Sequence, residues 1–417
     1  MLLAAKKNKL EKVAIPYSDC LAKTYKNDQG VFPGRSVFNH CQIVGYVARA
    51  ILSRIPLWLR SSLFPEGSEL VAASHDVGKV SPTFQEKIYR AIDNYFPNSK
   101  EELVGINPEH EIGWGGHGGV SQLTAQMLQV GQYIPEILGQ HHGYSPTLKL
   151  KGCESWDHPF GGHAWHNERE KLINQLKKEL NCDWPAVTSE AQMLVLSGLT
   201  TVADWIGSNS FFENPNDPWQ DRVHNALDSA GFKLPIFTPG LSFTEIFGFQ
   251  PHNLQIQFFE NVIEPGVYLL EAPMGLGKTE AALYAAYLTM VSGKATGLYF
   301  ALPTRLTSDK IYDRVQTFLT KILQTDHSAK LIHSSAWLRN LDQNLGEDGQ
   351  PSGSWFEPAK KSILWPFAVG TVDQALMAVI NVKHGFVRAF GLAGKVVILD
   401  EVHSYDMYTG TLLDQLI

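Results

Sequence analysis

The segment EAPMGLGKTEAAL (residues 271–283) constrains the fold of this chain more than any other feature. It follows the short apolar run GVYLL and leads into a stretch of helix-forming residues. Gly275 and Gly277 allow the backbone to curl so that several amides point at one anion. Lys278 can supply positive charge to the β- and γ-phosphates, and the Thr279 hydroxyl can bind magnesium. The segment therefore predicts a strand, a phosphate-binding loop and a helix in that order.

A pair of acidic residues further along the chain supports a nucleotide site. The segment VVILDEVH (residues 396–403) is a strand-like apolar run that ends in Asp400 and Glu401. One carboxylate is expected to coordinate magnesium, and the other to orient the attacking water. The two motifs together predict that this half of the chain binds and hydrolyses ATP with Mg²⁺.

The rest of the C-terminal half has the pattern of a parallel sheet covered by helices. Short, continuous apolar runs rich in β-branched residues suit buried parallel strands, and helical stretches separate them here. These runs are GVYLLEAP, TGLYFALP, AKLIHS, PFAVGT and KVVILDEV. We therefore predict an α/β domain at residues 239–417.

Residues 1–238 have the pattern of a mainly α-helical domain. FNHCQIVGYVARAIL places Phe38, Val44, Val47 and Ile51 on one helical face, and AQMLVLSGLTTVADWI has a similar periodicity. Strand-like alternation is scarce in this part. The polar stretch FFENPNDPWQD and the segment KLPIFTPG precede the boundary, which we place near residue 240.

Histidines are concentrated in the first domain, which contains ten of the 15 in the chain. A metal-dependent phosphohydrolase needs carboxylates and imidazoles that converge from several helices, so its ligands are scattered in sequence. The candidates are His40, His75, Asp76, His117, His141, His142 and Asp204. Mixed His and carboxylate ligation suits iron, manganese, cobalt or nickel, and suits magnesium less well because magnesium prefers oxygen.

Each candidate also has a structural interpretation. His40 can be an interior imidazole of a helix, and His117, among four glycines, can belong to a loop. The tandem His141–His142 makes a poor helix end unless something holds it, and Asp204 in an apolar helix must be paired or ligating if it is buried. Three further histidines are interpreted as loop residues outside any metal site: His158, His163 and His166.

The composition limits how the chain can meet a polyanion. Its net charge is −7, so a general electrostatic attraction to nucleic acid is absent. DNA would have to bind through local grooves, backbone amides or metal ions. No apolar stretch is long enough for a membrane span, and the four cysteines fit reduced thiols, so we expect a cytoplasmic protein with no membrane partner.

The motifs resemble those of known families. Four segments look like motifs I, Ia, Ib and II of a superfamily 2 helicase, in the right order. They are EAPMGLGKTEAAL, LPTRLTSDKIYDRV, VGTVDQAL and LDEVH. The candidate metal ligands also follow an order that resembles the HD superfamily of metal-dependent phosphohydrolases: His, then His-Asp, His, His-His and Asp. The pairing of both sets is similar to the CRISPR-associated nuclease-helicases of type I interference systems. This resemblance implies an HD-type domain followed by a RecA-like lobe.

The family resemblance also implies roles for individual residues. One ion would be held by His40, His75, Asp76 and Asp204. A second ion would be held by His117, His141 and His142, and Asp76 would bridge both. Lys79 would steady the phosphate or developing negative charge, although a solvated surface lysine is the alternative. Gln255 would read the adenine edge, and three residues would touch the nucleic-acid backbone: Thr304, Arg305 and Thr371.

The expected function follows from the same resemblance. A metal-dependent nuclease would cut single-stranded DNA that a 3′-to-5′ helicase feeds to it, after a guide-RNA surveillance complex recruits the protein. The printed sequence ends at Ile417, soon after Glu401, so we expect the second RecA-like lobe to be missing and ATP hydrolysis to be weak. Two alternatives stay open: an HD phosphohydrolase of nucleotides with a regulatory ATPase half, and a non-catalytic docking fragment.

Overall fold

The computed structural model describes residues 13–96, 99–148, 150–303, 308–324, 331–333 and 363–417. These residues form two compact units. The first contains the described residues up to Tyr46, together with Glu66–Val187 and Phe212–Asp217. The second contains Val47–Pro65, Thr188–Phe211 and Pro218–Ile417, so that helix α1 (Val37–Arg54) begins in the first unit and ends in the second. The boundary near residue 240 stays a prediction.

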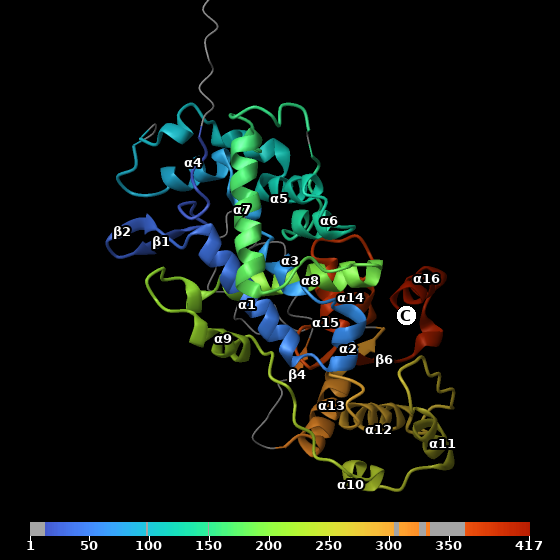
Figure 1. Ribbon diagram of the computed structural model, residues 1–417. Helices are drawn as coiled ribbons and strands as arrows, with labels where there is room; N and C mark the ends of the chain where they lie inside the picture. Colours follow the sequence, from blue (N-terminus) through green and yellow to red (C-terminus); the bar gives the residue numbers. More distant parts are fainter. Residues whose placement is uncertain (1–12, 97–98, 149, 304–307, 325–330, 334–362) are drawn as a thin grey trace, which may run out of the picture. The chain divides into compact units, whose positions relative to one another are not determined.

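The first unit is helical apart from one small hairpin. The hairpin pairs β1 (Thr24–Asn27) with β2 (Gly30–Pro33), and sequence periodicity missed it because its two strands are short. The longer helices include α7, which Figure 1 shows as the long green helix. The helices that follow α1 in this unit are α3 (Ser68–Ala73), η1 (Val77–Lys79), α4 (Pro82–Arg90), η2 (Glu101–Leu103), η3 (Pro108–Trp114), α5 (Gly116–Met127), α6 (Ile134–Gly139) and α7 (Gly162–Leu180).

One apolar cluster joins the helices of the first unit. Val37 and Cys41 of α1, Leu70 of α3 and Leu172 and Leu176 of α7 are all buried within it. These positions recur at helical spacing, so burial of one face of each helix drives the packing. The core thereby holds α1 and the segment that follows α3 in fixed positions.

The second unit contains a parallel sheet in the strand order β4-β5-β3-β6. The strands are β3 (Gly297–Leu302), β4 (Leu331–His333), β5 (Phe367–Thr371) and β6 (Lys395–Leu399). All pairs are parallel, with Phe300 opposite Val369 on one side and Ile398 on the other. The prediction of a mainly α domain followed by an α/β domain with a parallel sheet is confirmed.

Helices cover both faces of this sheet because the side chains of a strand alternate between faces. Leu298 and Phe300 pack against α12 (Lys278–Val291) and α13 (Ser308–Ile322). Tyr299 and Ala301 pack on the opposite face, with α14 (Val372–Leu376), α15 (Gly385–Leu392) and α16 (Met407–Leu416). Figure 1 shows the two helix layers on either side of the strands.

The remaining helices of the second unit are short, apart from α8. They are α2 (Leu57–Leu63), α8 (Glu190–Gly207), η4 (Ser210–Phe212), η5 (Gln220–Arg222), α9 (Val223–Ser229), α10 (Phe243–Phe247), α11 (Asn253–Asn261) and η10 (Val402–Ser404). Helix α8 packs closely on α15 at Gly198, where a Cβ atom would meet Phe390 and the Phe386 carbonyl. Among the described residues, every helix is too short or too polar to cross a membrane.

One predicted strand is wrong. The run GVYLLEAP (residues 266–273) forms no strand, whereas the other four predicted runs contain β3, β4, β5 and β6. Val267 and Leu269 are 70% and 75% exposed, so no burial of apolar surface holds this run against a neighbouring strand. Strand β6 consequently lies at the edge of the described sheet.

Candidate metal centre and nucleotide loop

The His75–Asp76 pair lies in a tight turn between α3 and η1. Ser121 of α5 anchors this turn, because its hydroxyl donates to the His75 carbonyl at 2.7 Å and accepts from the Gly78 amide at 2.9 Å. Both bonds are buried and therefore shielded from exchange with water. The turn is thus fixed against the first turns of α5, where His117 lies.

Gly78 allows this close approach. A Cβ atom at residue 78 would overlap the His117 carbonyl and the Ser121 amide, both of which are backbone atoms. Backbone atoms cannot rotate away as the end of a flexible side chain can, so any larger residue must push the turn and α5 apart. Gly78 therefore allows the turn that carries Asp76 to pack against α5, a role that the sequence analysis missed.

Asp76 is at the centre of the histidine cluster and is 2% exposed. Its Oδ2 atom lies 3.2 Å from Nε2 of His40 and 3.3 Å from Nε2 of His75. Its Oδ1 atom lies 3.2 Å from Nε2 of His117 and 3.6 Å from Nε2 of His141. The two oxygens of one carboxylate therefore face different pairs of histidines.

Opposing effects act on the pKa of Asp76. Burial alone would raise it, because a charged carboxylate loses its hydration. The charges of His75 and Lys79 and hydrogen bonds from His117 and His40 outweigh burial, and they hold the pKa of Asp76 well below its usual range. The carboxylate is thus kept ionised, which is the form that binds a cation.

Backbone carbonyls define which nitrogen of two histidines faces the cluster. Nδ1 of His75 lies 2.8 Å from the Ala72 carbonyl, and Nδ1 of His141 lies 2.6 Å from the Leu138 carbonyl. A carbonyl oxygen only accepts, so each Nδ1 must carry the hydrogen. In the neutral ring, the form that binds an ion, the lone pair is then on Nε2, the nitrogen that faces Asp76.

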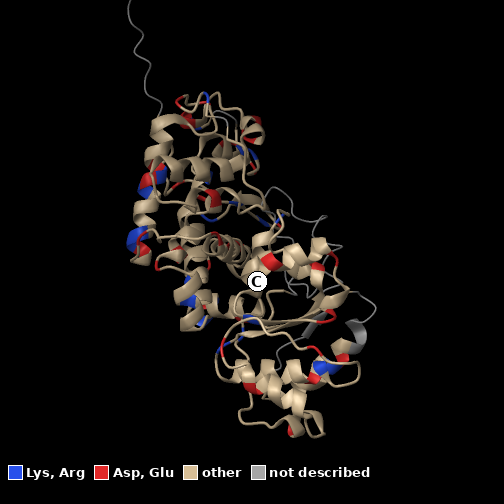
Figure 2. Ribbon diagram, turned by 90° about the vertical axis from the view of Figure 1, so that its right-hand side faces the viewer, with Lys and Arg blue, Asp and Glu red and all other residues tan. Residues whose placement is uncertain are grey.

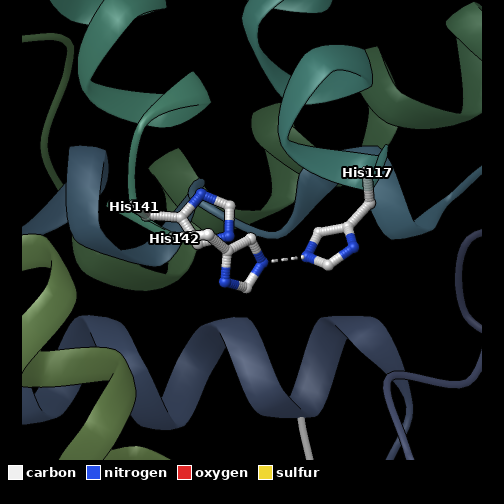
Figure 3. Close-up of side chains that lie close together, drawn as sticks. All are labelled: His117, His141 and His142. Carbon is white, nitrogen blue, oxygen red and sulfur yellow. Dashed lines mark hydrogen bonds between the residues drawn. The ribbon is translucent and has the colours of Figure 1, made fainter. Parts of the chain in front are cut away.

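Figure 3 shows a second group of histidines, two of which also face Asp76. It consists of His117, near the start of α5, and of His141 and His142, which follow α6. One nitrogen from each ring lies within 4.8 Å of the others, and Nε2 of His142 is 2.8 Å from Nε2 of His117. His142 is the exposed member of the group, so solvent or a substrate can reach it.

These residues fit divalent metal ions on the chemistry of their donors. In the first unit, His40, His75 and Asp76 offer two imidazoles and a carboxylate, and their ligand atoms lie within 4.8 Å of one another. The second group offers three imidazoles, with Asp76 Oδ1 nearby. Mixed nitrogen and oxygen donors of this kind suit manganese, iron, cobalt, nickel or zinc.

The other two residues predicted for this site occupy distinct surroundings. Asp204 is on α8, a helix of the second unit, and Oδ1 of Asp204 accepts from the Ser208 hydroxyl at 3.0 Å. Its role as a metal ligand stays a prediction. Lys79 places Nζ 2.7 Å from Asp76 Oδ2 and 5.4 Å from the ring centre of Phe84, and its side chain is 14% exposed. It is not the solvated surface lysine of the alternative interpretation.

The three histidines set aside in the sequence analysis are absent from both candidate metal groups, which were sought among the described residues. His163 pairs with Glu154 at 2.8 Å, and His166 stacks on Phe160. Burial lowers the pKa of His166 to about 4. His163 and His166 lie on α7, so the expectation of a loop was wrong for these two; His158 lies outside helices and strands.

The loop predicted to bind phosphate has the backbone that its glycines predict. Gly275 and Gly277 have φ angles of 83° and 67°, a region that strongly favours glycine. Lys278 and Thr279 begin α12, so the N-terminus of this helix points its amides at the loop. Nζ of Lys278 donates to the Ala272 carbonyl at 2.8 Å and to the Pro273 carbonyl at 3.3 Å.

Gln255 contacts the same loop. Its Nε2 atom donates to the Gly277 carbonyl at 2.9 Å, and its Oε1 atom accepts from the His252 amide at 2.9 Å. The side chain is 1% exposed. Gln255 therefore connects α11 to the loop, and its predicted contact with adenine stays a prediction.

The acidic pair follows β6, as predicted. Asp400 donates its amide to the Ala301 carbonyl at 3.1 Å, which continues the pairing of β6 with β3, and its Oδ1 accepts from the Glu401 amide at 3.0 Å. Glu401 is exposed and has a φ of 53°. Thr371 ends β5 and lies immediately before α14. Thr304 and Arg305 lie outside the described residues.

Glu111 is a further residue that sequence reasoning missed. It lies on η3, is 6% exposed, and places Oε1 3.9 Å from Nδ1 of His117. Its signal in the sequence was weak, because two residues six positions apart do not share one face of an α-helix. Along the described ribbon, basic and acidic residues are interspersed (Figure 2).

Comparisons with known proteins place these features in a family context. Residues 21–212 match the family described as "Cas3, HD domain". The chain is 32% identical to the CRISPR-associated endonuclease/helicase Cas3 of Thermus thermophilus, over 92% of this chain and 47% of the relative. The chain therefore spans about half the length of the curated relatives it matches.

Solved structures agree with the sequence relatives. The crystal structure of T. fusca Cas3 superposes with a TM-score of 0.73 at 29% identity, over 95% of this chain and 48% of that chain. A chain from a structure described as "CRISPR RNA-guided surveillance complex, pre-nicking" has a TM-score of 0.62 at 25% identity, over 97% of this chain and 46% of that chain.

Proposed function

We propose, because the chain belongs to the Cas3 family of CRISPR-associated nuclease-helicases, that its histidine cluster is a two-metal nuclease site for single-stranded DNA. The observation that carries this proposal is the position of Asp76, whose two oxygens face different pairs of histidines. One carboxylate shared in this way can bridge two ions. Bridging is the arrangement that a two-ion phosphodiesterase requires.

In this proposal, His40, His75, Asp76 and Asp204 hold one ion, and His117, His141 and His142 hold the other. Bound there, two divalent ions would supply positive charge to the scissile phosphate and acidify an attacking water. The protein's part is to orient the ligands: Ala72 and Leu138 keep the lone pairs of His75 and His141 on Nε2. Ser121 holds the turn that carries Asp76.

Lys79 completes the proposed site. Its ammonium group lies 2.7 Å from Asp76 Oδ2, on the side of the carboxylate that faces His40 and His75. An ion bound between these ligands would compete with Lys79 for that oxygen. The released ammonium group would then be positioned to pair with a phosphate oxygen of the substrate.

The α/β half is proposed to bind ATP with Mg²⁺ and to belong to the motor that delivers the strand. Gly275, Gly277, Lys278 and Thr279 would cradle the phosphates, Asp400 would hold Mg²⁺, and Glu401 would orient water. Delivery with 3′-to-5′ polarity and recruitment by a guide-RNA surveillance complex complete the proposal. A family neighbour solved in a structure of such a complex supports the choice of partner.

The test is cleavage of circular single-stranded DNA, which has no ends and therefore reports internal cuts. Metal-stripped protein should be inactive, and manganese, cobalt, nickel or iron added singly should restore cutting, with magnesium less effective. His163→Ala, which changes an exposed histidine outside the cluster, should cut like the wild type. Binding of two ions with no cutting by any of them would contradict the nuclease proposal. Rapid nucleotide hydrolysis without DNA cutting would favour the nucleotide phosphohydrolase instead.

The nucleotide loop gives a separate prediction. Lys278→Ala should weaken binding of ATP with Mg²⁺ by about 10- to 100-fold, because a charged hydrogen-bond donor to the phosphates contributes about 1.5–3 kcal/mol. Lys321→Ala, at an exposed position on α13, is the matched control. Titration with a fluorescent ATP analogue measures both variants. Equal affinities for all three proteins would contradict the assignment of the loop.

A further inference from the structure

Two histidines of the cluster share one orientation. His75 and His141 each turn Nδ1 toward a hydrogen-bond acceptor of the protein and Nε2 toward Asp76. In both rings the acceptor is a backbone carbonyl that follows from the local helix geometry. The main chain therefore sets the orientation of these two rings.

His117 has the same orientation with a different acceptor. Its Nε2 atom lies 3.2 Å from Asp76 Oδ1, and its Nδ1 atom faces the Glu111 carboxylate at 3.9 Å. This distance is about 1 Å longer than an ordinary hydrogen bond. A small rotation of either side chain would close it as His117 engages an ion.

Glu111 is held firmly enough to direct His117. It lies on η3, a short helix capped at its start by Asn107, whose Oδ1 accepts from the Glu109 amide at 3.1 Å. Trp114 at the end of η3 is buried in an apolar cluster with Val120 of α5 and Phe160. The carboxylate thus approaches His117 from an element that is packed against the helix carrying His117.

We propose that Glu111 is a positioning residue that fixes the tautomer and ring orientation of His117, and thereby sets the affinity of the second metal group. This inference rests on the proposed two-metal function. A carboxylate facing Nδ1 stabilises the hydrogen on Nδ1 and leaves the Nε2 lone pair for an ion.

Two substitutions at residue 111 separate positioning from packing. Glu111→Gln keeps an oxygen that can accept from Nδ1, whereas Glu111→Leu fills the space without an acceptor. Glu109→Leu changes an exposed residue of the same helix and is the control. Each protein is titrated with Mn²⁺ by calorimetry, and thermal unfolding is measured on the same samples.

We expect Glu111→Leu to bind one ion as the wild type does and the second about 10- to 100-fold more weakly. Glu111→Gln and Glu109→Leu should bind both ions like the wild type. Unchanged second-ion binding in Glu111→Leu would overturn the proposal. An equal loss of both ions in Glu111→Leu and Glu111→Gln would also overturn it, because the residue would then act only through packing.

A measurement on the metal-free protein keeps this inference separate from the proposed function. Nitrogen-15 NMR of the imidazoles should show a hydrogen on Nδ1 of His117 in the wild type and Glu111→Gln, whether or not Nε2 also carries one, and only partial occupancy of Nδ1 in Glu111→Leu. If the wild type binds no ion, the two-metal function fails, and the tautomer alone decides the role of Glu111. A wild-type His117 with no hydrogen on Nδ1 would contradict that role.

Discussion

Asp76→Asn should remove both metal ions in one step and reduce cleavage of single-stranded DNA by at least about a thousandfold. Asparagine has nearly the same shape as aspartate, but it carries no charge and replaces one oxygen with an amide that can only donate. Since each oxygen of Asp76 faces a different pair of histidines, the amide must face one of the two groups. Loss of charge stabilisation worth about 4 kcal/mol at the phosphate corresponds to that change in rate.

The control for this prediction is His142→Ala, which changes the exposed member of the second group alone. Calorimetric titration with Mn²⁺ should find one strong site in His142→Ala and none in Asp76→Asn. Cleavage of circular single-stranded DNA is measured on the same preparations. Retention of one site of wild-type affinity in Asp76→Asn would show that the carboxylate serves a single ion, and the bridging proposal would then fail.

The largest expected effect on stability is that of Gly78→Ala. The added methyl group would overlap backbone atoms of His117 and Ser121, which can move only if α5 moves. The energetic cost of overpacking against immobile backbone lies at the upper end of the usual range. We therefore expect the free energy of unfolding to fall by about 3 kcal/mol. The melting temperature of the histidine-rich unit should fall by about 5–10 °C.

Gly116→Ala is the matched control for Gly78→Ala. Gly116 immediately precedes His117 and has a φ of 64°, but no atom lies within 4 Å of the position that an alanine methyl group would take there. Alanine at residue 116 carries only the backbone strain of a left-handed conformation, about 1–2 kcal/mol. Thermal unfolding of both variants, followed by circular dichroism, makes the comparison. Equal destabilisation would mean that the close approach of the turn to α5 is not a constraint on residue 78.

The α/β half shows where local pattern suffices for the fold. The runs around β3, β5 and β6 are continuous and apolar because helices cover both faces of the sheet, so composition alone identifies them. The run at residues 266–273 has the same composition, yet it forms no strand and leaves Val267 and Leu269 exposed. Strand formation needs a partner edge as well as an apolar sequence, and the partner is a long-range feature.

In the candidate site, too, the sequence pattern identified some residues and missed others. Residue type and order were enough to single out His40, His75, Asp76, His117, His141 and His142, because few chemistries use so many imidazoles around one acid. The same reasoning missed Gly78, Ser121 and Glu111. None of these three is unusual in type, and each acts through a contact with a residue of another element.

The sequence by itself determined the residue types available for metal and phosphate chemistry and the periodicity of most helices and strands. These properties depend on neighbours within a few positions along the chain. Only the tertiary structure decided that Asp76 presents one oxygen to each group of histidines and that Glu111 faces His117. The contacts of Asp76 with His117 and His141 join residues tens of positions apart, and the contact of Glu111 with His117 joins two different helices. Both depend on how buried faces pack across several helices, which no local pattern encodes.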